Sequence, residues 1–205
     1  MASNTDIAFS PSVKAIQSWR GSRDLYRKVE MDGGFRARID NRLKAALAET
    51  NSAYLTTASA TGQPYSQHRG GPRGFIRILD DQTIGFADYS GNRQYITAGN
   101  LAENPQAFLF LMDYARRRRI KIWGSARVVT DDEELIERLM PEGYGARPEA
   151  AILFEIIAWD INCPQHIPQK IDGDMVAAAL AERDAEIARL KAELAALRAS
   201  KGDKS

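Results

Sequence analysis

The sequence predicts a mainly β protein, in which an antiparallel barrel of six to seven strands with flanking helices is followed by a C-terminal coiled-coil helix. Two observations carry this prediction. Strand-like segments follow one another between residues 53 and 159, and they are joined mainly by tight turns. Closing such strands into a barrel removes exposed edges. After residue 172 the chain contains no proline or aromatic residue and is rich in Ala, Glu, Arg and Leu.

The composition indicates a single main core with appendages, since 44% of the 205 residues are hydrophobic and 27% are charged. The net charge of +1 leaves no overall field to recruit nucleic acid or an anionic membrane, so any affinity for anions must come from local clusters. The single cysteine, Cys163, excludes an intrachain disulfide. No apolar segment has the length of a membrane span and the N-terminus lacks a signal pattern, so we expect a cytoplasmic protein.

Three regions are expected along the chain. Residues 1–50 form a helical flank, with a short helix near residues 12–19 and apolar residues at helical spacing between Ile39 and Leu47. Residues 51–170 form the barrel. Residues 171–205 form a helix for self-association.

The barrel strands follow from apolar alternation and turn residues. Predicted strands cover residues 53–59, 64–69, 74–79, 83–88, 107–113, 119–129 and 150–159. Helices are predicted over residues 92–104, which end at Asn104-Pro105, and near residues 131–140, where acidic residues begin the segment. In the strand 119–129, Arg119 and Lys121 share one face with Trp123 and Ser125.

The turn "YSGNRQY", residues 89–95, is a candidate anion site. Ser90 or Asn92 can cap the following helix, whose first backbone N–H groups lack partners, and Arg93 adds a fork of donors. An ordinary capped helix with a solvent-exposed arginine explains the same residues.

A second basic cluster, "SQHRGGPRGFIR", places His68, Arg69, Arg73 and Arg77 around a Gly-Gly-Pro interruption. It is either an anion site or a glycine-rich loop in which His68 is structural. The run Arg116 to Arg119 is interpreted as a solvated turn, because no interleaved aromatic residues support nucleic-acid binding. His166 has no neighbouring ligand, so no metal site is predicted.

The tail carries apolar residues spaced alternately by four and three between residues 175 and 198, with Arg183 as a polar break. This spacing favours a coiled coil. A single amphipathic helix packed on its own barrel is the alternative.

The order of these motifs resembles the pyridoxamine 5′-phosphate oxidase-like family of FMN-binding split barrels. The resemblance lies in "TASATGQP", "GFIRIL", "IGFADYSGNR", "NLAENP" and "AFLFLM", in that order, between residues 43 and 129. It implies a split β-barrel, FMN as cofactor, and a homodimer with the flavin at the subunit interface.

The resemblance also implies cofactor-binding residues. The family's Ser-Arg-Lys phosphate turn corresponds to residues 91–93, in which only Arg93 keeps the basic character; Ser90 precedes this turn. Its basic strand ends near Arg77, with Arg69 or Arg73 in the place of the leading arginine. The full set implied or considered for cofactor binding is His68, Arg69, Arg77, Ala87, Asp88, Ser90, Asn92, Arg93, Arg119 and Lys121.

The C-terminal substrate motif of true pyridoxamine phosphate oxidases is absent from "AWDINCPQHIPQK". We therefore expect an FMN-dependent oxidoreductase acting on another small molecule. The alternative is a non-catalytic flavin- or ligand-binding assembly module. A deazaflavin or a haem is a further possibility, and for haem only His68 and His166 could serve as axial ligands.

Overall fold

The computed structural model describes residues 4–162 and 164–202, so Cys163 lies outside the described residues. The chain divides into two compact units. One comprises Met1–Asp113 with Arg118–Pro164, and the other Tyr114–Arg117 with Gln165–Ser205. None of the helices in the described part of the chain is long and apolar enough to cross a membrane.

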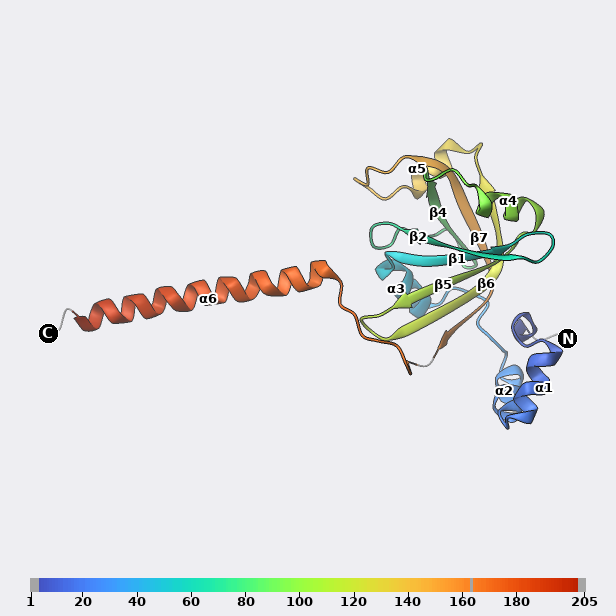
Figure 1. The fold of residues 1–205 in the computed structure, drawn as a ribbon, viewed down its shortest axis with the longest axis horizontal. Coiled ribbons are helices and arrows are strands. Elements are labelled where there is room, and N and C mark those ends of the chain that lie inside the picture. The colour runs from blue at the N-terminus through green and yellow to red at the C-terminus, as the bar shows by residue number, and fades with distance from the viewer. Residues whose placement is uncertain (1–3, 163, 203–205) are drawn as a thin grey trace. The chain divides into compact units, whose positions relative to one another are not determined.

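The first unit is a seven-stranded antiparallel sheet that curves into a split barrel (Figure 1). Its strands are β1 (Ser52–Ala58), β2 (Pro64–Gly70), β3 (Arg77–Ile78), β4 (Thr83–Tyr89), β5 (Gln106–Asp113), β6 (Arg118–Val129) and β7 (Pro148–Asn162). The spatial order is β2-β1-β5-β6-β7-β4-β3. This architecture confirms the predicted fold class.

In the described part of this unit, five helices and a 3-10 turn accompany the strands. They are η1 (Asn4–Ile7), α1 (Pro11–Trp19), α2 (Arg23–Met31), α3 (Asn41–Glu49), α4 (Ile96–Glu103) and α5 (Glu133–Leu139). Asp40 and Asp132 begin α3 and α5, because their carboxylates accept hydrogen bonds from backbone N–H groups of the first turn. The sequence did not predict α2 as a separate helix.

The core lies inside the curved sheet. Alternate residues of β1, β5 and β6 point inward, and Leu55, Leu109 and Ile122 are fully buried there. Helix α3 packs Leu43 and Leu47 against the same core. A tight approach between β6 and β7 requires glycine at Gly124, because a Cβ there would come within 1.9 Å of the Glu155 carbonyl oxygen.

The predicted strand 74–79 is largely wrong, since only Arg77–Ile78 pair with β4. Pro72 has no N–H to donate, and Gly74 adopts a left-handed backbone with φ +74°. The Gly74 N–H donates to the Thr50 carbonyl oxygen at 2.9 Å, which turns the chain inward. Phe75 is consequently buried in the core.

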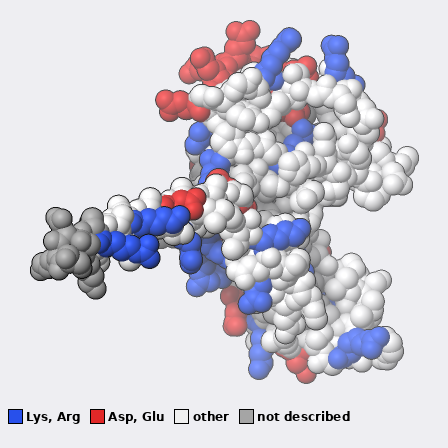
Figure 2. Space-filling model, turned by 60° about the vertical axis from the view of Figure 1, so that its left-hand side comes forward, with Lys and Arg blue, Asp and Glu red and all other residues white. Residues whose placement is uncertain are grey.

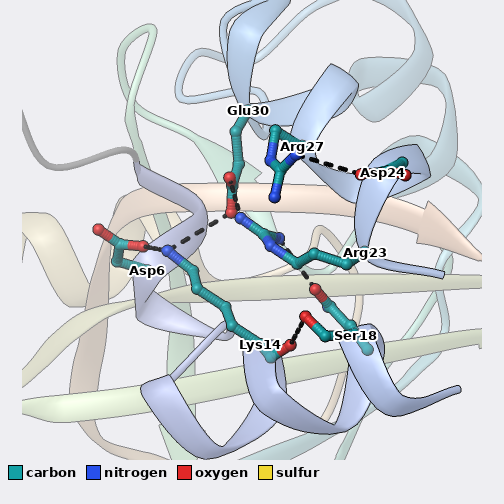
Figure 3. A network of polar contacts seen from close by, with 8 residues as sticks. Asp6, Lys14, Ser18, Arg23, Asp24, Arg27 and Glu30 are labelled. Atoms are coloured by element: carbon teal, nitrogen blue, oxygen red, sulfur yellow. Dashed lines mark hydrogen bonds and ion pairs between the residues drawn. The ribbon is translucent and has the colours of Figure 1, made fainter. Parts of the chain in front are cut away.

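The N-terminal helices are held together by a network of polar contacts (Figure 3). Lys14 lies 2.6 Å from Asp6 and 3.5 Å from Glu30, and Arg23 bonds both Glu30 and Gln17. The hydrogen bond from Arg23 lowers the pKa of Glu30 below its ordinary value. This network joins η1, α1 and α2 into one flank.

Trp159 of β7 joins that flank to the barrel. Its indole Nε1–H donates to the Arg38 carbonyl oxygen at 2.9 Å, and its side chain is fully buried. The backbone of Trp159 also pairs with that of Arg36, whose guanidinium lies 4.9 Å from the indole centroid. Trp159 therefore helps to fix the segment between α2 and α3, together with the Ile39 N–H, which donates to the Asp81 carbonyl oxygen at 2.8 Å.

The second unit contains α6 (Gly173–Gly202). Ahead of this helix, the Gln169 side-chain amide donates to the Ala115 carbonyl oxygen at 2.9 Å, and the Lys170 ammonium lies 4.6 Å from the ring centroid of Tyr114.

Trp159→Phe is expected to lower the free energy of unfolding by about 1–3 kcal/mol, because it leaves the Arg38 carbonyl unpaired and the indole space partly empty. Urea denaturation measures this change. Trp19→Phe is the control, since Trp19 is 75% exposed. Equal stability of the two variants would show that Trp159 has no special role.

Candidate functional site

The candidate site lies at the split of the barrel, where two strands approach each other without a backbone ladder. β2 is one edge of the sheet, and β4 lies at the other end of the strand order, next to β3. An ion pair between Arg69 of β2 and Asp88 of β4 joins these two ends. Beside it, the Thr97 hydroxyl of α4 donates to the Gln67 side chain of β2 at 2.8 Å, which links β2 to α4.

A pocket of about 290 Å³ opens beside this ion pair. It is lined by Gln67, Arg69, Asp88, Tyr89, Gly91, Asn92, Arg93, Gln94, Tyr95, Thr97, Ala98 and Glu149. Two arginines and two carboxylates line it, so their formal charges sum to zero. The pocket brings together four residues that the sequence pointed to, namely Arg69, Asp88, Asn92 and Arg93.

Arg69 is the most buried cation of the pocket, with a side chain only 12% exposed. Its terminal nitrogens donate to Asp88 and to Gln67, the latter at 3.1 Å. Its Nε is buried and has no hydrogen-bond partner. A buried donor without a partner costs about 1–3 kcal/mol, so an acceptor that reached Arg69 Nε in the pocket would be favoured.

Asp88 is held in a poorly solvated position. Burial raises the pKa of its carboxyl, the Arg69 guanidinium opposes this rise, and the Glu149 carboxylate adds to it. Burial dominates because Arg69 does not fully replace the lost water. Asp88 therefore takes up a proton at a higher pH than an ordinary aspartate does.

The loop between β4 and α4 bends sharply at two residues with a left-handed backbone, Arg93 (φ 62°) and Tyr95 (φ 54°). The Arg93 Nε–H donates to the Tyr95 hydroxyl at 3.5 Å, and both side chains line the pocket. Such conformations are uncommon for residues other than glycine and often mark functional loops.

The expectation that Ser90 or Asn92 caps the helix is wrong, because α4 begins only at Ile96. The residue before it, Tyr95, makes no capping hydrogen bond with its side chain. Asn92 instead accepts from the Gln94 N–H at 3.3 Å within the loop. The first N–H groups of α4 have no acceptor within the helix, which leaves them available to a ligand of the pocket.

A second group of candidate residues lies on the outer face of the sheet. His68 follows Gln67 along β2 and so points the other way, where its Nε2 lies 2.9 Å from Ser52 Oγ and its ring packs on Tyr54. Arg119 and Lys121 share that outer face on β6, as the alternation predicted. Lys121 lies 3.2 Å from Asp160 and 5.1 Å from the Trp123 ring centroid.

The remaining candidates do not line the pocket either. Ala87 is buried in a small core with Leu135 and Leu139. The Ser90 N–H donates to the Arg147 carbonyl oxygen at 2.9 Å, which places it on the loop side of β4. Arg77 is exposed on β3, opposite Gly85.

Several lining residues were not predicted. Gln67 could have been found, since it lies two residues before Arg69 on the same face of β2. Thr97 lies in the first turn of α4. Glu149 gives no local signal, because only the pairing of β4 with β7 brings it to Asp88.

Comparison with known proteins shows the family of this chain. A model of the family described as pyridoxamine 5′-phosphate oxidase matches residues 39–163, which is more than half of the chain. No curated protein matches the sequence.

Three solved structures are similar to this chain. HupZ of Group A Streptococcus is 20% identical, with a TM-score of 0.47 over 65% of this chain and 99% of that chain. A candidate pyridoxamine 5′-phosphate oxidase from Lactobacillus delbrueckii is 18% identical, with a TM-score of 0.47 over 61% and 95%. An FMN-binding protein from Syntrophomonas wolfei is 14% identical, with a TM-score of 0.47 over 73% and 97%. The family match over residues 39–163 decides the assignment: this chain belongs to the pyridoxamine 5′-phosphate oxidase family.

Proposed function

We propose that the protein is an FMN-binding oxidoreductase of the pyridoxamine 5′-phosphate oxidase-like group that acts on a small molecule other than pyridoxamine phosphate. One observation carries the proposal: in a chain of this family, a pocket is lined by Arg69, whose Nε is buried and has no hydrogen-bond partner, together with Arg93 and the first turn of α4. These are the donors that a phosphate monoester requires.

The residues of the pocket suit a phosphate in their chemistry. Arg93 lies at the exposed side and offers a guanidinium fork, while Arg69 offers a buried donor. The first N–H groups of α4 add the positive end of the helix dipole. Asp88 and Glu149 oppose the anion, so Arg69 must be shared between Asp88 and the ligand.

FMN would supply the redox chemistry, and the chain would bind and orient it. In this proposal Arg69 and Arg93 anchor the phosphate, and Gln67 and Thr97 keep β2 and α4 at the spacing that this requires. No side chain of the pocket needs to form a covalent bond with the substrate.

The proposal includes a homodimer with the flavin at the subunit interface, as the family resemblance implies. Pockets for drug-sized ligands usually have volumes of about 300–1,000 Å³. The volume of this pocket, about 290 Å³, lies at the lower limit of that range. It accommodates the phosphate end, so the ring system would extend beyond it. His68, Arg119 and Lys121 lie on the outer face, and in a homodimer they could reach a flavin held by the partner.

A binding module without turnover is the second candidate, and the Arg69–Asp88 pair favours it. This ion pair already satisfies much of the charge of Arg69 in the free protein. A pocket with balanced charges suits a neutral ligand as well as an anionic one.

The purified protein is expected to bind FMN and to show the flavin absorbance bands. Titration of the full chain with FMN, followed by denaturation and identification of the released chromophore, tests this directly. Folded protein that takes up no FMN at micromolar concentration would sink the oxidoreductase proposal and leave the binding module.

Arg93→Ala should weaken FMN binding about 10- to 100-fold, because a charge-assisted hydrogen bond contributes about 1.5–3 kcal/mol. Fluorescence quenching of FMN measures the dissociation constant. Arg42→Ala, which changes an exposed arginine of α3, is the matched control and should leave the dissociation constant unchanged. If both variants bind as the natural protein does, the phosphate lies elsewhere.

Asp88→Asn should tighten FMN binding at pH 8 by on the order of tenfold, about 1.4 kcal/mol, because it removes a negative charge beside Arg69. The pKa of Asp88 is raised, so lowering the pH protonates it in the natural protein and removes the same charge.

The advantage of Asp88→Asn should therefore shrink as the pH falls toward the ordinary range of aspartate, about 4, and the decrease should begin above that range. Titration of the FMN phosphate affects both proteins alike and cancels from the ratio of their dissociation constants. A ratio that stays constant from pH 8 down through the ordinary range of aspartate, about 4, would contradict this role of Asp88.

A further inference from the structure

Helix α6 carries an uncovered aliphatic stripe. Six large aliphatic residues lie on it, each between 43% and 60% exposed. They are Val176, Leu180, Ile187, Leu190, Leu194 and Leu197. All side chains between Gly173 and Arg198 are exposed, so no described residue of this unit covers the stripe. Exposing this much apolar surface to water is unfavourable. A helix in a protein is usually stabilised by packing such an apolar face against another element.

The stripe has the period of a coiled coil. Its members follow one another in steps of four and three when Arg183 is included, which is an average of about 3.5 residues. In heptad terms Leu180, Ile187 and Leu194 occupy a positions. Val176, Arg183, Leu190 and Leu197 occupy d positions. From Val176 to Arg198 no large aliphatic residue lies off this stripe.

We propose that α6 pairs with α6 of a second copy as a parallel, in-register, two-stranded coiled coil. Charge complementarity selects this partner. The g positions carry Glu186 and Glu193, and the e positions that they would face in the partner are those of Lys191 and Arg198. Both contacts join opposite charges, and the two-fold symmetry makes each of them twice.

Within each helix, Arg189 keeps the two carboxylates in place. It lies 2.6 Å from both Glu186 and Glu193. Since an ionised carboxylate accepts several hydrogen bonds, this leaves acceptor sites for a cation of the partner. Figure 2 shows acidic and basic side chains together along α6.

Arg183 fits the same arrangement. A d-position side chain in a parallel pair packs beside the following e position of the partner, which here is Asp184. The polar break in the stripe thus meets a carboxylate. A polar residue at a single core position fixes the register of a coiled coil, at a cost in stability.

An antiparallel pair fits less well. It would bring g positions against g positions, so that Glu186 would face the carboxylate of Glu193. Two carboxylates that face each other repel, which disfavours the antiparallel pair. The parallel pair brings the two copies of Gly173 together and so tethers the preceding units at a high effective concentration. This proposal holds whether or not the barrel binds flavin.

Cysteine cross-linking of the full chain tests the proposal. Cys163, the only cysteine of the sequence, is first replaced by serine. Leu190→Cys and, separately, Leu197→Cys then place a thiol at a d position, where the two copies meet at a Cα separation that permits a disulfide. Ala192→Cys, on the opposite side of the helix, is the control. Mild oxidation and a non-reducing gel report the covalent dimer.

Both d-position variants should form the covalent dimer at least about fivefold faster than Ala192→Cys does, because only they hold the sulfur atoms within bonding reach. No cross-link at either position, or equal rates at all three, would overturn the proposal. So would a mixture of Ile187→Cys and Leu190→Cys chains that cross-links while neither chain does so alone, since that result requires an antiparallel pair.

Discussion

The ion pair between Arg69 and Asp88 is the contact on which the candidate site depends. β2 is the edge strand at one end of the sheet and β4 is the second strand from the other end, so they are not neighbours in the strand order and no backbone ladder joins them. A polar contact between side chains therefore closes the barrel at this point, with the Thr97–Gln67 hydrogen bond beside it. The pocket lined by both residues of the ion pair shows that the split closed in this way leaves room for a ligand.

The same ion pair creates a conflict within the site. A partly buried arginine requires a counter-charge in the free protein, and Asp88 provides it. An anionic ligand must then compete with Asp88 for Arg69. Protonation of Asp88 relieves this competition, because the neutral carboxyl no longer attracts Arg69. Burial raises the pKa of the carboxyl and so makes the neutral form easier to reach. Asp88 would then weaken the binding of anions without blocking it.

Local patterns in the sequence predicted the strands and the faces of several of them. The alternation from Arg119 to Ser125 indicated the outer face of β6, and the apolar periodicity around Leu43 indicated the inner side of α3. The resemblance to a flavin-binding family directed attention to Asp88 and Arg93. These features depend on neighbouring residues in the sequence or on an ordered set of motifs, so a single sequence is enough to predict them.

The remaining features depend on contacts between distant segments. Glu149 belongs to the pocket only because β7 pairs with β4. Phe75 turns inward because Gly74 bonds to Thr50, far back in the chain, and this shortens the predicted strand. The helix α4 begins at Ile96 because the loop before it takes two left-handed residues, Arg93 and Tyr95, and no residue preference indicates such a bend.

Comparing the dissociation constants of FMN and riboflavin tests the central claim most directly, since the two ligands differ only by the phosphate. If the pocket at the split binds the phosphate through Arg69 and Arg93, FMN should bind at least about tenfold more tightly, a difference of about 1.4 kcal/mol. Equal dissociation constants would show that the phosphate makes no contact with these arginines, and would contradict the account of the pocket as a phosphate site.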